Sequence, residues 1–279
     1  MRGRSHQRLF RLESMLGIVL SLTPNLASAT SYIILASQRR TIIIAADTLV
    51  IKTHSESDHV GQALEKHCKI ARLGNFGFVA SGTTGYLKAG SGDSIRDWDT
   101  VVDARNAYKH NPNKPSAIVD AWAAITLNHF RTLYRVNPKR FGSIDSLILW
   151  GCFALFDSKG NPYVIEKKVV FKSKQASVEM ETENVPIADG ILVANNPITQ
   201  ELIATHPKVY FDRWQSEQIK INAKDRDWKL AEFFILTTAD LDEHVGKMVD
   251  VLELYPKSKS RWIQNFTCPQ STALRQKLR

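Results

Sequence analysis

The sequence predicts an α+β protein in which two antiparallel sheets are covered on the outside by helices. Short runs rich in Ile, Val and Tyr come first, then two segments with helical periodicity, then strands, helices and closing strands. Short turns connect successive strands, which is typical of antiparallel pairing, and separate blocks of strands and helices favour layers over alternating βα units. No repeat or low-complexity linker divides the chain, so one domain is expected.

The first half of the expected strands forms two hairpins. Residues 32–36 and 41–46 are rich in Ile, and the polar residues 37–40 between them predict a turn. Residues 70–73 and 76–80 flank Gly74-Asn75, a turn dipeptide in reversed order. A strand pair therefore begins close to residue 30.

Two helices are expected between the hairpins and the central strands. The stronger one starts at Pro115, ends before Pro138, and places four apolar residues on one stripe: Ile118, Trp122, Ile125 and Leu133. The other covers residues 93–108, while the polar stretch 53–65 predicts a loop.

The second half of the chain continues with strands and helices. The apolar run 146–156 predicts a strand covered on both faces, and after a turn residues 162–166 pair back onto it. Helices are expected at 198–205 and 228–238. Strands at 249–254 and 261–263 complete the domain.

The N-terminus has the pattern of a secretory signal peptide. Four arginines precede the apolar run 15–22, and Ala27-Ser28-Ala29 forms a small-residue cleavage site. The apolar run is too short to span a bilayer as a helix. We therefore expect residues 1–29 to be a signal peptide, residues 30–264 a secreted or periplasmic domain, and residues 265–279 a basic C-terminal tail, with no membrane contact after cleavage.

Charge and composition exclude some classes of function. The formal net charge is +9, and the expected mature chain keeps +6 because residues 1–29 hold four arginines and one glutamate. This mild excess is spread out and lacks interleaved aromatic residues, so nucleic-acid binding is not expected.

The sequence predicts neither a metal site nor a cofactor. The histidines at 54, 59 and 67 do not have the spacing of metal ligands. Cys68, Cys152 and Cys268 are odd in number and widely spaced, so we expect no disulfide framework, and Cys152 is expected in the core. Asn265-Phe266-Thr267 is a glycosylation sequon, relevant if the source organism glycosylates secreted proteins.

Cleavage after Ala29 would make Thr30 the first residue of the mature chain. An N-terminal threonine carries a hydroxyl nucleophile and, on the same residue, an amine that can act as its general base. A nearby lysine would help to keep that amine neutral, because like charges disfavour each other. A lysine paired with a carboxylate is therefore the arrangement to expect.

Asp47 and Lys66 are the candidates for that pair. Asp47 ends the apolar run 41–46, where an unpaired buried carboxylate would be costly. A hairpin would return its second strand beside Thr30, and Lys66 precedes the next strand. Lys69 is the rival of Lys66 for this role.

Four sequence elements resemble the active β subunits of the proteasome. They are Thr30-Ser31-Tyr32, then Ile44-Ala45-Ala46-Asp47, then Lys66-His67-Cys68-Lys69-Ile70, then Ala80-Ser81-Gly82-Thr83. Residues 146–151, 157–160 and 163–166 resemble the central strand pair of that family, and residues 242–251 resemble its late Asp-x-x-Ser-Gly-Gly element.

This resemblance implies a four-layer α-β-β-α sandwich and N-terminal-nucleophile hydrolase activity on a peptide or other small amide. Thr30 would attack to form a threonyl ester, with Asp47 and Lys66 tuning the proton network. Asp242 would be a supporting carboxylate. The backbone N–H of Ser81, or of neighbouring Gly82, would form the oxyanion hole.

Two departures from the family pattern favour an alternative function. Val245 stands where the family has a serine, and the middle Ser-Gly-Ser turn has no clear counterpart, with Asp189-Gly190 the nearest candidate. The alternative is therefore a catalytically inactive relative that serves as a binding or assembly protein. Proteasome subunits form rings, and both a monomer and a homo-oligomer remain open for this chain.

Overall fold

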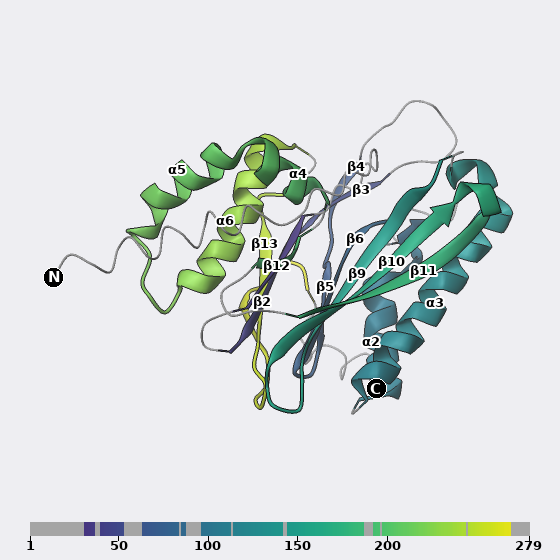
Figure 1. Cartoon of the computed structure of the whole chain (residues 1–279), viewed down its shortest axis with the longest axis horizontal. Helices are drawn as coiled ribbons and strands as arrows, with labels where there is room; N and C mark the ends of the chain where they lie inside the picture. The colour runs from purple at the N-terminus through teal and green to yellow at the C-terminus, as the bar shows by residue number, and fades with distance from the viewer. Residues whose placement is uncertain are drawn as a thin grey trace.

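The computed structural model of the chain is an α+β structure with two five-stranded antiparallel sheets (Figure 1). It describes residues 31–36, 40–52, 63–83, 85–87, 96–112, 114–141, 144–186, 192–195, 197–243 and 245–268. The expected fold class, α+β with two antiparallel sheets and helices, is confirmed at this level. The expected signal peptide and most of the basic tail lie outside these residues.

The first sheet has the order β12-β1-β2-β13-β14. Its strands are β1 (Tyr32–Ala36), β2 (Ile42–Asp47), β12 (Leu192–Asn195), β13 (Val249–Leu254) and β14 (Arg261–Gln264). The predicted hairpin of residues 32–36 and 41–46 is confirmed, because Tyr32 is opposite Ala46 and Ala36 is opposite Ile42.

The second sheet has the order β11-β10-β9-β6-β5. Its strands are β5 (Ile70–Leu73), β6 (Phe76–Gly82), β9 (Ser146–Phe156), β10 (Pro162–Lys172) and β11 (Ser177–Pro186). Two further strand pairs, outside these sheets, join β3 (Leu49–Lys52) to β4 (Ala63–Lys66) and β7 (Gly85–Leu87) to β8 (Arg96–Asp99).

The two faces of β1 and β2 pack into different cores because strand side chains alternate. Ile33 and Ile43 belong to a core shared with helix α6 (Arg226–Leu241). Ile34 and Ile44 belong to the core shared with the second sheet. Every residue of both strands is buried, which explains why the sequence is apolar on both faces.

The two sheets contact each other face to face. A Cβ atom at Gly77 of β6 would lie 2.3 Å from Ile44 Cδ1 of β2 and 3.1 Å from Leu254 Cδ1 of β13. At the other side of the contact, Tyr32 Oη lies 3.0 Å from Cys152 Sγ. The absence of a side chain at Gly77 therefore lets the sheets approach closely.

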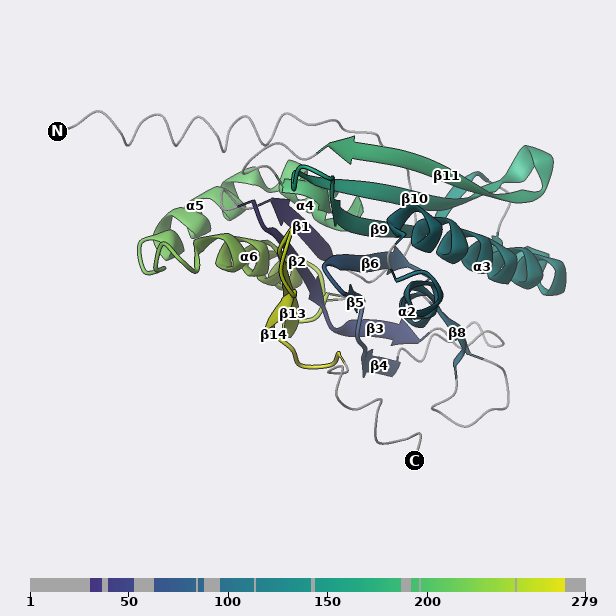
Figure 2. The ribbon, with the colours of Figure 1, turned by 90° about the horizontal axis from the view of Figure 1, so that it is seen from below.

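Helices α2 (Thr100–His110) and α3 (Pro115–Val136) pack on the second sheet (Figure 2). Trp122 of α3 packs at an angle against the rings of Phe78 and Phe153, and a Cβ at Gly151 would lie 2.5 Å from its ring. The start of α3 at Pro115 agrees with the prediction. Ile125, however, was expected on the buried stripe and is 37% exposed, because Thr126 takes the inward position.

Helices α4 (Pro197–Thr205) and α5 (Pro207–Gln218) precede α6, and short 3₁₀ helices cover Pro138–Phe141 and Ser173–Gln175. The helix expected over 93–108 is wrong at its start: residues 96–99 form β8, and the helix begins at Thr100. The stretch expected to be a loop through residue 65 contains β4. Among the described helices, none is both long enough and apolar enough to cross a membrane.

Candidate functional site

Asp47 is the centre of a buried polar site at the end of β2. Its carboxylate accepts hydrogen bonds from the Ser31 N–H at 2.7 Å, the Leu49 N–H at 3.1 Å and the Gly246 N–H at 3.0 Å. The Lys69 ammonium completes the set, with Nζ 2.9 Å from Oδ1. Four donors around a residue that is 1% exposed fit an ionised carboxylate, and they offset the cost of burying it.

Lys69, the rival of Lys66 in the sequence analysis, is paired with Asp47. Lys69 lies between β4 and β5 and is 1% exposed, so its ammonium is held in the interior beside the carboxylate. Lys66 ends β4, where its backbone is in register with Leu49, and its side chain lies outside the described atoms. The sequence named both lysines, and of the two the structure describes only the side chain of Lys69.

Thr30, the expected nucleophile, lies outside the described residues, but its neighbour Ser31 is well defined. Ser31 is fully buried, and its carbonyl accepts the Asp47 N–H at 3.1 Å. Position 30 is joined by one peptide bond to Ser31, and the N–H of Ser31 binds Asp47 of the Asp47–Lys69 pair.

Thr199 supplies a second hydroxyl beside Ser31. Its Oγ1 lies 2.6 Å from Ser31 Oγ, and its side chain is fully buried near the start of α4. The candidate suggested by sequence for the Ser-Gly-Ser turn, Asp189-Gly190, lies outside the described residues. Sequence reasoning missed Ser31 and Thr199, since an ordinary Ser or Thr carries no signal until the fold brings it to a site.

Ser81 and Gly82 lie at the end of β6, beside β9. Ser81 is opposite Trp150, Gly82 is opposite Leu149, and the Thr83 N–H donates to the Ile148 carbonyl at 2.9 Å. Both residues therefore lie on the β6–β9 pairing where β6 ends.

Gly82 also has a backbone that demands glycine. Its φ is +93°, and a Cβ there would lie 2.4 Å from the Ile148 carbonyl oxygen. A side chain is excluded by both conformation and space. Of the two predicted oxyanion donors, Gly82 is therefore the position at which the backbone requires glycine.

Asp242 follows α6 and borders an open depression of about 860 Å³. The depression is also lined by Leu49, Gly246 and Lys247. Gly246 separates it from Asp47, and a Cβ at Gly246 would lie 2.8 Å from Leu49 Cβ and 3.3 Å from the Asp47 carboxylate. Gly246 therefore borders both the depression that Asp242 lines and the Asp47 site.

Val245 is a core residue. It is 3% exposed and packs in the cluster beneath α6, so it offers the site no hydrogen bond. Its burial explains why an apolar residue stands there. At this position, where the resemblance led us to look for a serine, the chain uses an apolar side chain to fill the core beneath α6.

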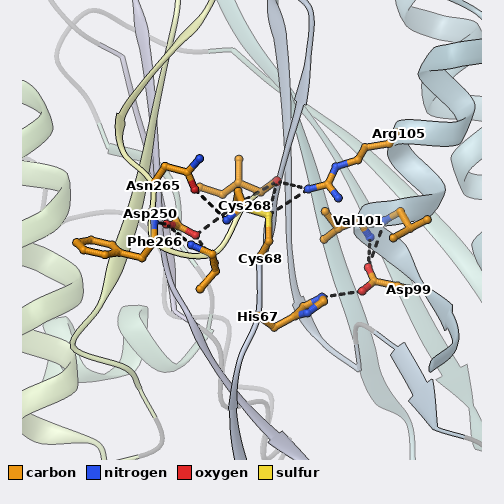
Figure 3. The surroundings of a disulfide bond; sticks show 12 residues. His67, Cys68, Asp99, Val101, Arg105, Asp250, Asn265, Phe266 and Cys268 are labelled. Atoms are coloured by element: carbon orange, nitrogen blue, oxygen red, sulfur yellow. Dashed lines mark hydrogen bonds and ion pairs between the residues drawn. A yellow bond between two sulfur atoms is a disulfide. The ribbon is translucent and has the colours of Figure 1, made fainter. Parts of the chain in front are cut away.

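A disulfide adjoins Lys69, and this corrects the expectation that the cysteines do not pair. Cys68 and Cys268 are bonded across 200 residues of sequence (Figure 3). The odd count misled the sequence argument because Cys152 is separate: it is free and fully buried in β9, as expected. Next to the disulfide, His67 Nε2 lies 2.6 Å from Asp99 Oδ2, a close contact without hydrogen-bond geometry.

A second buried polar group lies between the sheets. Burial is the main cause that raises the pKa values of Tyr32 and Cys152, and nearby Glu166 reinforces both shifts. Burial likewise raises the pKa of Glu166, against the opposing effect of Lys168 at 3.3 Å. These groups are therefore held in their neutral forms more strongly than in water.

The described residues contain no group of three or more His, Cys, Asp or Glu side chains that could hold a metal ion. The described arrangement is a buried carboxylate–lysine pair that also holds the N–H of Ser31, with the Thr199 hydroxyl beside the Ser31 hydroxyl. No family model matches the sequence, and no curated protein sequence matches it either.

Proposed function

We propose that this chain is an N-terminal-nucleophile amidohydrolase that is exported and cleaved so that Thr30 becomes its first residue. One observation carries the proposal: the buried Asp47–Lys69 ion pair, whose carboxylate also binds the N–H of the residue after Thr30. A lysine–carboxylate pair next to a mature N-terminus is the arrangement that an N-terminal hydroxyl needs for activation.

In this proposal the Thr30 hydroxyl attacks the carbonyl carbon of a peptide or small amide. The free α-amine, whose ordinary pKa is about 8, accepts the hydroxyl proton, and the Lys69 charge favours the neutral amine. The Gly82 N–H stabilises the oxyanion. The C–N bond then breaks, the departing amine takes the proton, and water hydrolyses the threonyl ester to restore Thr30.

The proposal includes the four-layer α-β-β-α arrangement of this hydrolase class. Helix α6 contacts β1 and β2, α2 contacts β5 and β6, and the two sheets contact each other through Gly77. In the proposal Asp242 is a supporting carboxylate. It lines the same open depression as Gly246, whose N–H binds Asp47.

Export to a secreted or periplasmic location is part of the same proposal. The leader pattern supports it, and the Cys68–Cys268 disulfide is of a kind that persists in oxidising compartments. Substrates would be short peptides or other accessible amides, handled by a monomer or a homo-oligomer.

The first test is the intact mass of the protein purified from its native export pathway. A chain beginning at Thr30 supports the proposal. A retained leader or a different start leaves no free amine at this site and contradicts the proposal. Thr30→Ala separates cleavage from chemistry, because alanine still fits the cleavage site.

The second test uses a β-lactone, whose strained ring acylates an activated hydroxyl. We expect peptide mass mapping to find the acyl group on the N-terminal residue, at least about tenfold less in Lys69→Met and unchanged in Lys172→Met, whose ammonium pairs with Glu181 away from the site. Acylation that is equal in both variants contradicts a role for Lys69.

The alternative function is a catalytically inactive binding or assembly protein with the same fold. Buried Val245, which offers the site no hydroxyl, is the observation that favours it. Correct cleavage combined with no acylation of the N-terminal residue would support this alternative.

A further inference from the structure

The three consecutive residues before β5 are each tied to a different part of the molecule. His67 contacts Asp99 at the start of α2, Cys68 is bonded to Cys268, and Lys69 is paired with Asp47. Figure 3 shows the first two of these links side by side. The position of Lys69 therefore depends on a short segment that the disulfide holds at its centre.

The other end of the disulfide is a short segment anchored on one carboxylate. Asp250 of β13 accepts the Phe266 N–H and the Thr267 hydroxyl, both at 2.5 Å, and Asn265 Oδ1 accepts the Cys268 N–H at 2.9 Å. Cys268 is 6% exposed, as is Cys68. Residues 265–268 thus form a latch on β13. The disulfide joins this latch directly to the segment that carries Lys69.

The two sulfur atoms have opposite electrostatic surroundings. Arg105 of α2 directs Nη2 to Cys68 Sγ at 3.1 Å and also donates to the Ile70 carbonyl at 3.2 Å. Cys268 Sγ lies 3.2 Å from Asp250 Oδ2, a contact and not a hydrogen bond because a disulfide sulfur carries no proton. A thiolate would be stabilised on Cys68 by the guanidinium and destabilised on Cys268 by the carboxylate.

We propose that the Cys68–Cys268 disulfide is a reducible lock that fixes the Lys69 segment against Asp47 and that a dithiol reductant opens. This inference does not depend on the proposed activity, because it concerns only the position of the segment. Arg105 makes the lock asymmetric: Cys68 is the leaving group, and Cys268 is the sulfur that is attacked.

The chemistry of opening balances with one dithiol. A thiolate of the reductant attacks Cys268 Sγ, the S–S bond breaks, and Cys68 leaves as a thiolate beside Arg105. The second thiol of the reductant, as its thiolate, then attacks the mixed disulfide, and Cys268 leaves with the bonding electron pair. The reductant is oxidised to its cyclic disulfide, the protein gains two electrons, and the two thiol protons pass to the cysteine thiolates or to solvent.

The first experiment measures how fast dithiothreitol opens the lock in the folded full-length mature protein. Samples are quenched with a maleimide and weighed intact. We expect two labels, on Cys68 and Cys268, while Cys152 stays unlabelled because it is fully buried in the folded core. Labelling of all three cysteines together would mean that reduction requires global unfolding, and this would overturn the proposal.

The role of Arg105 is tested by Arg105→Gln, which we expect to slow reduction roughly tenfold. Arg105→Lys should restore a rate within about threefold of wild type, because it keeps the positive charge. Arg131→Gln is the control: Arg131 is an exposed arginine that also donates to a carbonyl, that of Val178, but lies away from the disulfide. Equal rates in Arg105→Gln and Arg131→Gln would overturn the assigned asymmetry.

Amide hydrogen exchange tests the coupling to Lys69 and works even if a variant does not fold. In wild-type protein, reduction should speed exchange at least about tenfold in peptides covering residues 67–73 and 264–268, and leave β9 and β10 unchanged. Unchanged protection at residues 67–73 after complete reduction would overturn the proposal.

Discussion

Asp47 is the residue on which the polar contacts of the candidate site converge. Three backbone N–H groups and one ammonium surround its carboxylate, and none of these donors is adjacent to it in sequence. The residue is therefore important for stability as well as for any chemistry beside it. Removing its charge and removing its partner should have different consequences.

We predict that Asp47→Asn lowers the free energy of unfolding by about 3–5 kcal/mol, because it leaves the Lys69 charge buried without its carboxylate. Lys69→Met should cost less, about 1–3 kcal/mol, since three N–H groups still bind the carboxylate. Lys172→Met, which breaks a pair with a half-exposed glutamate, should cost under about 1 kcal/mol. Urea denaturation measures all three, and equal losses for the two lysine variants would contradict the prediction.

Glu166 should make stability depend on pH. Burial is the largest cause that raises the pKa of Glu166, so the folded protein holds this proton more tightly than the unfolded chain. The free energy of unfolding therefore falls as pH rises from the unfolded pKa through the folded pKa. Glu166→Gln removes this term, and its stability relative to wild type should rise as pH increases from the unfolded pKa through the folded pKa of Glu166.

Asp145 provides a control of opposite sign. Hydrogen bonds from Ser173 are the main cause that lowers the pKa of Asp145, so its contribution is present above the unfolded pKa and is lost as pH falls through the folded one. Asp145→Asn should therefore be less stable than wild type near about pH 7, with the difference shrinking toward about pH 3. Parallel pH trends in the two variants, measured by urea denaturation, would show that neither carboxylate causes the change.

At the scale of elements, helix α2 connects local sequence to the site. Its N-cap, Asp99, accepts the N–H groups of Val101 at 2.8 Å and Val102 at 3.2 Å through one oxygen. Its other oxygen contacts His67, next to the disulfide. One side chain therefore begins the helix and holds the segment that carries Lys69.

We predict that Asp99→Ala lowers the free energy of unfolding by about 1–2 kcal/mol, because the cap is lost. Asp99→Asn should lose clearly less, since asparagine caps helices as well as aspartate does, although it gives up the charge opposite His67. Chemical denaturation of both variants checks this. If both lose the same stability, the contact with His67, and not the cap, is the main contribution of Asp99.

The elements that sequence reasoning missed had signals of their own. In β11, Val178 and Met180 alternate with Glu179 and Glu181, a period of two that was not used. In α5, Pro207 stands in the first turn, and the buried Tyr210 and Trp214 are four residues apart. Strands β3 and β4 differ from these. They are short and form a separate two-stranded sheet, so each is identified by its pairing with the other.

At the scale of the whole molecule, the spacing of the two sheets depends on Gly77. We predict that Gly77→Ala costs about 1–3 kcal/mol, because the added methyl would meet Ile44 Cδ1 at 2.3 Å. Ile44→Val deletes that atom, so the double variant should be more stable than the sum of the two single losses implies. A double-mutant cycle by urea denaturation measures this coupling, and strict additivity would contradict direct contact between the sheets at this point.

By itself the sequence determined the α+β class, most strands, the main helices and the importance of Asp47, because hydrophobic periodicity and turn residues are local signals. Only the tertiary structure paired Lys69 with Asp47, brought Thr199 to Ser31, and joined Cys68 to Cys268. These choices depend on strand register and on contacts between residues up to 200 positions apart. Local patterns carry no information on such distances, whereas packing and hydrogen bonding in the folded chain fix them.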